Sequence, residues 1–236
     1  MPPVWLSMSW RDLMAETNTT HLNVKPFLLL GILLFLLGTA LAFIIPEISP
    51  DPILSTYFGS RPFPTLIPTV TFLTHLNSPP ALLVYLFVLL GILLFRKEWR
   101  RGLFALLTLA GTALGNSYLK FLISRPRPSP CLIDISSPSF PSWHSATSAA
   151  LALMLWILFV QPLQKGKVKN LLSLLLFLWP LIIGSTRLFL NAHWLSDIVA
   201  GWGMGIAITA SIALLLPPNV RQSHITGVRR PRHHKH

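Results

Sequence analysis

Six strongly apolar runs alternate with shorter polar segments along the chain. The runs cover about residues 26–45, 80–95, 102–119, 145–162, 171–186 and 196–216. A helix needs about 20 apolar residues, or about 17 at the low end, to cross the hydrocarbon core of a bilayer. The pattern therefore predicts an all-α fold, a polytopic membrane protein with six transmembrane helices. The second run is the shortest and is expected to begin slightly before Pro80.

The polar flanks divide the chain into three parts. Residues 1–25 are expected to form an N-terminal cytoplasmic or interfacial segment, in which Trp5 and Trp10 suit the membrane interface, with a disordered tail as the alternative. Residues 26–216 form the six-helix membrane domain, and 217–236 form a basic cytoplasmic tail. The first apolar run is longer than the core of a typical signal peptide, so it is expected to remain as the first helix.

Composition supports this picture and gives the orientation. The chain is 52% hydrophobic and only 11% charged, whereas a soluble domain carries roughly a quarter charged residues. Fourteen of the 19 basic residues fall in the two termini and the loops that share their side of the membrane. Basic loops stay cytoplasmic, so both termini are expected in the cytoplasm. The net charge of +12 thus indicates topology and not a nucleic-acid partner.

The five remaining basic residues are expected on the outer side, and most lie close to histidine, aspartate, serine and proline. They are Arg61, Lys120, Arg125, Arg127 and Arg187. The third and fifth predicted helices end at this side, and the fourth and sixth begin there. Three separate segments therefore meet at one membrane face, whichever way the protein is inserted. An earlier stretch on the same side, residues 58–76, is expected to be a re-entrant or interfacial piece in which Arg61 and His75 could touch a headgroup.

The first segment, "KFLISRPRP", contains Lys120, Arg125 and Arg127. Arginine presents a planar fork of donors that matches phosphate oxygens, and lysine adds a point charge. The prolines at 126 and 128 end the helix and stiffen its exit. The alternative is a cluster of basic side chains that only snorkel to the interface.

The second segment, "FPSWHSATSAA", places Ser142 as a candidate N-cap and His144 in the first turn of the following helix. Free backbone N–H groups and the helix dipole attract anions at such a start. The alternative is a capping serine beside an interfacial histidine.

The third segment, "TRLFLNAHWLSD", contains Arg187, His193 and Asp197. Residues four apart share one face of a helix, so Asp197 could hold one imidazole nitrogen of His193 and leave the other as a nucleophile. Arg187 could clamp an anion there, while Asn191 and Trp194 are expected to serve the turn and the interface. The alternative is a His–Asp pair that only stabilises the start of a helix.

Carboxylates are scarce on the outer side. Besides Asp197 they are Glu47, Asp51 and Asp134, and they are not clustered along the chain. A two-metal phosphatase needs several bridging carboxylates around its metals. We therefore predict a reaction that needs no metal and no other cofactor. The single cysteine, Cys131, excludes an intrachain disulfide.

Taken together, the three segments resemble the signature of the type-2 phosphatidic acid phosphatase superfamily, K-x6-R-P, P-S-G-H and S-R-x5-H-x3-D. The resemblance covers roughly residues 60–216 and has two departures: Thr186 stands for serine and Trp143 for glycine. Threonine keeps the hydroxyl. The tryptophan side chain must point away from the phosphate, toward lipid or substrate, which affects the expected substrate shape more than the reaction type.

The resemblance implies a role for each matching residue. His193 would be the nucleophile, Asp197 would orient it, and His144 would protonate the leaving group. The phosphate would be bound by Lys120, Arg127, Arg187, Ser142 and the N–H of Trp143, with Arg125 in a supporting role.

The implied substrate is a membrane lipid phosphate, such as undecaprenyl diphosphate, phosphatidylglycerol phosphate, phosphatidic acid or a phosphorylated lipid A. Three alternatives remain open at this point. They are an anionic-lipid binder with impaired catalysis, a lipid-to-lipid phosphotransferase, and a haem protein that uses His144 and His193 as axial ligands.

Overall fold

The computed structural model describes residues 23–60 and 63–218, and within these ranges it contains helices and no strands. The N-terminal segment predicted at 1–25 and the tail at 217–236 lie almost wholly outside the described residues, as does Arg61. The elements are α2 (Lys25–Thr39), η2 (Ala40–Ile44), η3 (Pro46–Ile48), α3 (Asp51–Ser60), α4 (Ile67–His75), α5 (Pro79–Phe95), α6 (Trp99–Ile123), α7 (Trp143–Leu155), η4 (Trp156–Val160), α8 (Lys167–Phe189) and α9 (Leu195–Leu215).

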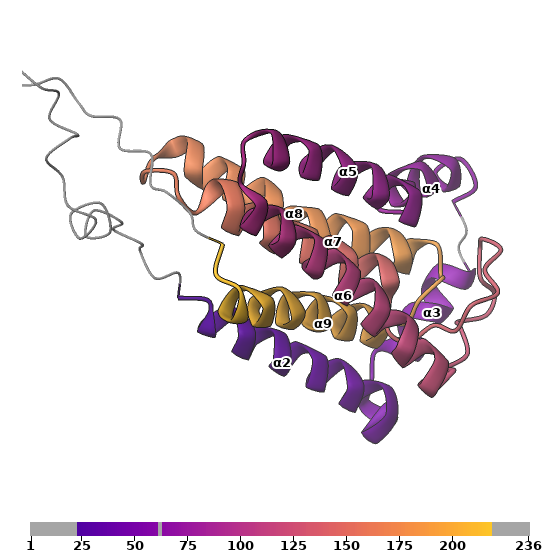
Figure 1. Cartoon of the computed structure of the whole chain (residues 1–236). Coiled ribbons are helices and arrows are strands. Elements are labelled where there is room, and N and C mark those ends of the chain that lie inside the picture. The colour runs from indigo at the N-terminus through magenta and orange to yellow at the C-terminus, as the bar shows by residue number, and fades with distance from the viewer. Residues whose placement is uncertain (1–22, 61–62, 219–236) are drawn as a thin grey trace, which may run out of the picture.

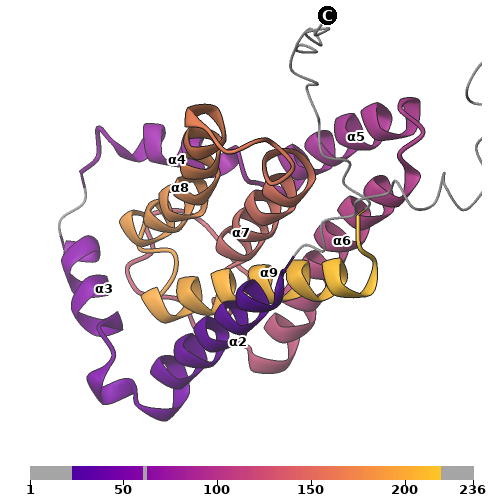
Figure 2. The same ribbon diagram turned by 90° about the vertical axis from the view of Figure 1, so that its left-hand side faces the viewer.

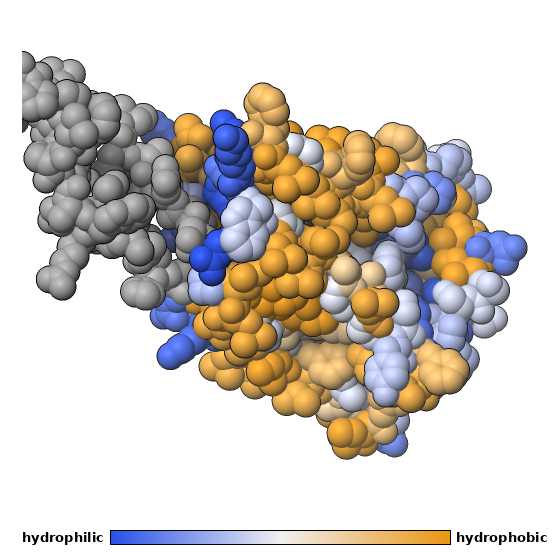
Figure 3. All heavy atoms as spheres, in the orientation of Figure 1, coloured by the Kyte–Doolittle hydropathy of each residue, from blue (hydrophilic) through white to orange (hydrophobic). Residues whose placement is uncertain are grey.

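Six helical stretches are long and apolar enough to cross a membrane, as the sequence predicts. The second of them joins α4 to α5 across a short turn, so the apolar stretch begins at Ile67 and not near Pro80. Part of the predicted interfacial piece at 58–76 is therefore α4, which packs against α8. Figure 3 shows apolar side chains covering the middle of the bundle, with polar side chains near its two ends.

Helix α7 is the centre of the bundle. Its residues Ser145–Met154 are all buried, and it packs against α6, α8 and α9. The short side chains in "SATSAALA" let neighbouring helices approach closely, as small residues do in membrane bundles. This central position carries the start of α7, with Ser142 and His144, into the interior of one end of the molecule.

Helix α2 lies along α9, as Figures 1 and 2 both show, and the two helices have the most extensive contact in the molecule. A Cβ atom built on Gly203 would stand 2.2 Å from the backbone nitrogen of Phe35, and one on Gly38 would stand 2.4 Å from that of Ala200. Glycine is therefore needed at both positions, because only a residue without a side chain permits this separation. The tight contact fixes the position of α9 and of the segment at its start, which contains His193 and Asp197.

The loop from Ser124 to Ser142 crosses the end of the bundle where α6 and α8 end and α7 and α9 begin (Figure 1). Its Phe140 is fully buried against Ala42, Ala200 and the ring of Phe43. The N–H of Ser142 donates to the carbonyl of Asp197, 3.0 Å away. The loop is thus anchored to α2 and α9 directly before the helix that carries His144.

Candidate active site

The three segments singled out in the sequence meet at this end of the bundle. Lys120 comes from the last turn of α6, Arg127 from the following loop, and Arg187 from the last turn of α8. His144 lies in the first turn of α7, and His193 lies in the turn that precedes α9. Direct contacts or electrostatic interactions connect His193 with Arg127, Lys120, Arg187 and His144. The structure therefore brings these residues, from distant stretches of the chain, together at one end of the bundle.

His193 and Asp197 contact each other, but not as two residues of one helix. Helix α9 begins at Leu195, so the expectation that both lie on a helix is wrong for His193. Asp197 Oδ2 accepts a hydrogen bond from the N–H of Trp194 at 3.1 Å, and this cap ends the helix before it reaches His193. The same oxygen lies 3.4 Å from His193 Nδ1. The carboxylate thus combines a capping role with contact to the imidazole.

The other imidazole nitrogen faces a cation. His193 Nε2 lies 3.1 Å from Arg127 Nη1. Backbone carbonyls hold the Arg127 guanidinium in place: Nη1 donates to Ala192 at 2.5 Å and Nε to Ser137 at 2.7 Å. With Nδ1 toward Asp197, Nε2 is the nitrogen that is free to attack a group bound beside Arg127.

Two further cations line the site without a carboxylate partner. Lys120 Nζ donates to the carbonyls of Pro138 and Ser139. Arg187 is 2% exposed. Counting the described residues alone, its guanidinium has one hydrogen bond, from Nη1 to the hydroxyl of Thr74 at 3.1 Å, and its Nε has none. In the part of the chain that the structure describes, neither residue takes part in a salt bridge, and Arg127 does not either.

Ser142 is the N-cap of α7, as the sequence predicts: its hydroxyl accepts from the N–H of Ser145 at 3.4 Å. Trp143 packs against the main apolar core of the bundle with its indole N–H buried and unpaired. Its side chain is therefore directed into the helix bundle. A tryptophan can thus stand at the position of the signature glycine without its side chain occupying the phosphate site. Of the first turn, the N–H groups of Trp143 and His144 are left for an anion.

Two positioning residues were missed in the sequence analysis. Thr74, in α4, contacts Arg187, and Asn77, in the turn after it, donates to the His144 carbonyl at 3.1 Å and to the Thr147 hydroxyl at 2.7 Å. Both side chains are fully buried. The sequence did contain a signal for them, because two polar residues lie within an apolar stretch. Burying a polar side chain costs free energy unless it finds a hydrogen-bond partner.

One arrangement of the carboxylates was not foreseen from the sequence. Arg125 forms an ion pair with Asp51 and another with Asp197. Glu47 is exposed, and it forms no ion pair with any other described residue. Among the described residues, no three histidine, cysteine, aspartate or glutamate side chains stand close enough to hold a metal ion together.

The electrostatics of the site favour a neutral imidazole. Burial lowers the pKa of His193 well below its usual value, and the neighbouring charges of Arg187, Arg127 and Lys120 lower it further. Burial also lowers the pKa of Arg127. A neutral imidazole surrounded by three unpaired cations is suited to a nucleophile that meets an anion.

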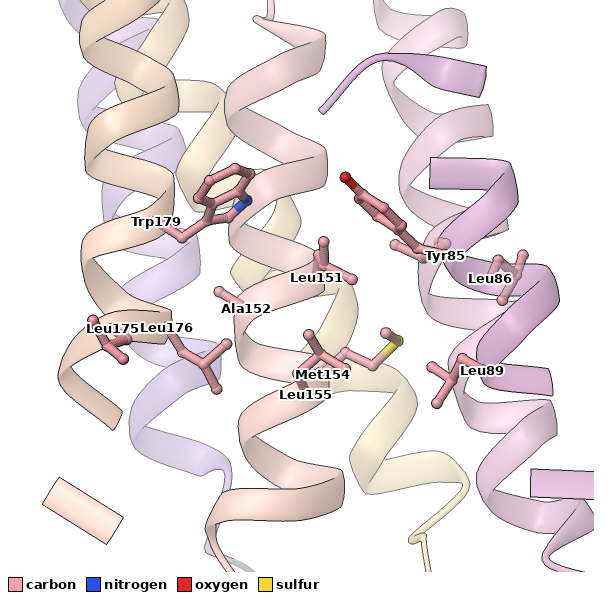
Figure 4. Close-up of a pocket in the computed structure, with 11 residues that line it drawn as sticks. Tyr85, Leu86, Leu89, Leu151, Ala152, Met154, Leu155, Leu175, Leu176 and Trp179 are labelled. Carbon is pink, nitrogen blue, oxygen red and sulfur yellow. The ribbon is translucent and has the colours of Figure 1, made fainter. Parts of the chain in front are cut away.

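An apolar groove lies among the middle parts of four helices. It has a volume of about 320 Å³ and is lined by α5, α6, α7 and α8. Figure 4 shows Tyr85 and Trp179 on either side of α7, with Leu151 between them. Trp179 Nε1 donates to Asn77 Oδ1 at 3.4 Å, and Asn77 contacts His144. Leu151, in the lining of the groove, is seven residues beyond His144, which is about 10 Å along the helix.

Comparisons with known proteins agree with this architecture. Residues 101–221 match the PAP2 superfamily. The chain is 30% identical over 148 residues to phosphatidylglycerophosphatase B of Bacillus subtilis (strain 168), a match that spans 61% of this chain and 72% of that protein. It is 33% identical over 130 residues to lipid A 4'-phosphatase of Bacteroides thetaiotaomicron, with 48% of this chain and 54% of that protein covered.

Two crystal structures have the same arrangement of helices. A transmembrane PAP2-type phosphatidylglycerolphosphate phosphatase from Bacillus subtilis superposes with a TM-score of 0.67 and 26% identity, over 80% of this chain and 94% of that one. LpxE from Aquifex aeolicus superposes with a TM-score of 0.55 and 25% identity, over 70% and 94%. This chain is therefore a multi-pass membrane protein that belongs to the PAP2 superfamily.

Proposed function

We propose that the protein is a lipid phosphatase that hydrolyses a phosphate or diphosphate monoester through a phosphohistidine on His193. One observation carries the proposal. Among the described residues, Lys120, Arg127 and Arg187 have no carboxylate partner, and they surround an imidazole held by Asp197. Arg187 is buried and the other two are partly buried, and cations without counter-ions in such places are costly. A bound phosphate would supply the missing negative charge.

The phosphate oxygens would lie among these three cations and the start of α7. The free N–H of Trp143 and the hydroxyl of Ser142 would add donors at the positive end of the helix dipole. Phosphoryl transfer depends mainly on positioning and charge neutralisation, which such a cluster provides. We therefore keep the proposal that the reaction needs no metal.

The chemistry would proceed in two displacements at phosphorus. His193 Nε2 attacks, the P–N bond forms, and the P–O bond to the lipid breaks while His144 gives its proton to the leaving oxygen. Water then attacks the phosphohistidine, His144 takes up a proton from that water, and the P–N bond breaks to release inorganic phosphate. Asp197 stabilises the positive charge that develops on His193.

The substrate class follows from the groove. An amphiphile could place its phosphate at His193 and a hydrocarbon chain between Tyr85 and Trp179, against Leu151. Phosphatidylglycerol phosphate and a phosphorylated lipid A are the leading candidates, since the relatives are named for these lipids. Undecaprenyl diphosphate and phosphatidic acid have the same chemistry.

The orientation proposed from basic residues puts this site at the outer membrane face, with the termini in the cytoplasm. In this proposal, residues 26–216 form the six-helix membrane phosphatase domain. A lipid binder with impaired catalysis and a lipid-to-lipid phosphotransferase could use the same pocket. The binder would release no phosphate, and the phosphotransferase would pass the phosphoryl group to a second lipid and not to water.

The test is phosphate release from a panel of these lipids by detergent-solubilised protein in the presence of a chelator. The wild type is expected to release inorganic phosphate from at least one, and His193→Ala to release none while its thermal midpoint remains close to that of the wild type. Near-wild-type turnover by His193→Ala would refute the scheme. Lipid binding by an inactive wild type would favour the binder, and label transfer to a second lipid would favour the phosphotransferase.

A further inference from the structure

A buried ion cluster lies next to Asp197 on the side away from His193, and the reaction scheme does not use it. Arg125 Nη1 donates to Asp197 Oδ1 at 2.6 Å, and Arg125 Nη2 donates to Asp51 Oδ2 at 3.1 Å. The side chains of Asp197 and Asp51 are 0% and 4% exposed, and that of Arg125 is 13% exposed. One arginine therefore bridges two carboxylates from elements far apart in the sequence.

Asp51 is also attached to the first turn of α9. Its Oδ1 accepts from the N–H of Ser196 at 3.0 Å, and its Oδ2 accepts from the hydroxyl of Ser196. Arg125 Nη1 donates to the same hydroxyl at 2.8 Å. Asp51 begins α3, so the cluster joins α3, the loop after α6, and the helix that carries Asp197.

The guanidinium of Arg125 is held by aromatic rings as well. Its central carbon lies 5.4 Å from the ring centre of Phe43 and 5.3 Å from that of Trp194. At such distances a cation is attracted to the ring face. The position of the donor to Asp197 is thus set by four groups that do not belong to the phosphate site.

We propose that Asp51 and Arg125 act as a positioning pair for the catalytic carboxylate, with Arg125 fixing Asp197 against His193 and Asp51 balancing the charge of Arg125. This inference rests on the proposed function. With Oδ1 held by Arg125, Oδ2 remains directed at His193 Nδ1. With Asp51 present, the three ions carry a net charge of −1, so the negative charge of Asp197 stays effective at the imidazole.

The side chains around His193 are mostly positive, so the negative charge available from Asp197 is important for stabilising a charge on the imidazole. Lys120 from α6, Arg127 from the loop and Arg187 from α8 are positive, and His144 from α7 is close by. Asp197 is the carboxylate that faces this group of side chains directly. Without Asp51, the charge of Arg125 would cancel that of Asp197, and the developing charge on His193 would lose its stabilisation.

The decisive variant is Asp51→Asn, which keeps a side-chain oxygen for the N–H of Ser196 and removes the charge. Its kcat is expected to fall about 10- to 100-fold, because small displacements of a catalytic group cost this much. Its KM is expected to stay within about threefold of wild type, because the phosphate-binding cations are untouched. The acidic limb of the pH profile of kcat/KM should move down by about half a pH unit. Removal of the Asp51 charge leaves the site more positive, which disfavours protonated His193.

A double variant separates charge from position. Asp51→Asn/Arg125→Gln restores the net charge of −1, so its acidic limb should return to that of the wild type while kcat remains low. The control is Glu47→Gln, which removes an exposed carboxylate at the same end of the protein and should behave as wild type. The substrate is the lipid that the wild type cleaves fastest in the panel above.

An Asp51→Asn protein with wild-type kcat and an unmoved acidic limb would overturn the inference and leave the proposed function intact. A wild type that releases phosphate from no lipid would overturn the proposed function, and this inference with it. If Asp51→Asn does not fold, Arg125→Lys replaces it. Lysine keeps the charge but cannot bridge both carboxylates, so kcat should fall about 10-fold with the limb unmoved, and an unchanged kcat would be the contrary result.

Discussion

Arg187→Met is expected to make the unliganded protein more stable and nearly inactive. In the described part of the chain, the buried guanidinium of Arg187 has one hydrogen bond, to Thr74, and no ion pair. Its positive neighbours, Arg127 and Lys120, add repulsion. Methionine fills a similar volume without a charge that must be desolvated.

The size of both effects follows from these contacts. Replacing a buried ion pair by well-packed apolar side chains is often neutral or stabilises by about 1–4 kcal/mol, and we expect a gain in this range for Arg187, which lacks the attraction of a partner. For a protein of this size, about 2 kcal/mol corresponds to a rise of about 4–8 °C in the thermal midpoint. If the guanidinium gives two charge-assisted hydrogen bonds to phosphate, at about 1.5–3 kcal/mol each, their loss lowers kcat/KM by about 10²- to 10⁴-fold.

Arg125→Met is the matched comparison, because the same substitution is made at an arginine that has partners. Arg125 forms ion pairs with Asp51 and Asp197, and breaking a buried pair costs about 3–5 kcal/mol. Its thermal midpoint should therefore fall where that of Arg187→Met rises. Both thermal midpoints are measured in detergent with a fluorescent dye that does not react with thiols. The values of kcat/KM are measured by phosphate release.

Two outcomes for Arg187→Met would contradict these expectations. If Arg187→Met lowers the midpoint as far as Arg125→Met does, the Arg187 charge is compensated in the unliganded protein. Arg187→Met with near-wild-type kcat/KM would show that this side chain does not bind the reacting phosphate.

Three further predictions concern the imidazole, the helix contact and the groove. The acidic limb of kcat/KM should lie below pH 6.5, because burial and cations lower the pKa of His193 and the nucleophile must be neutral; a pH–rate profile with its limb at 6.5 or above would contradict this. Gly203→Ala should destabilise by about 1–3 kcal/mol in thermal unfolding, whereas Gly91→Ala, with nothing within 4 Å of its added Cβ, should not. Ala152→Phe should raise KM for long-chain lipid phosphates and leave KM for short-chain ones unchanged, and equal effects on both would argue against a hydrocarbon chain in the groove.

The helices and the convergence of the site follow from the sequence because the membrane restricts the possibilities. A span must be apolar over a known length, and consecutive helices must exit and enter on the same face. These two conditions place Lys120, Arg127, Ser142, His144, Arg187 and His193 together without any knowledge of side-chain packing. Ser142 as the N-cap of α7 was equally accessible, because a serine before an apolar run is a local signal.

What the sequence did not reveal depends on tertiary contacts between segments with no fixed spacing. Asp51 lies 74 residues from its partner Arg125, and Thr74 lies 113 residues from Arg187. The assumption that His193 begins α9 failed for a local reason, because Asp197 caps the helix at Trp194 and leaves His193 outside it. Trp143 could be recognised as unusual, but its packing into the bundle depends on the crossing of several helices.

A structure of the protein with bound orthovanadate would test the central claim most directly. Vanadate mimics a phosphoryl group in transfer, and the proposed scheme requires it to bond to His193 Nε2 with its oxygens on Lys120, Arg127 and Arg187 and near the start of α7. Vanadate bound elsewhere, or bound here without a bond to His193, would contradict the assignment of this imidazole as the nucleophile.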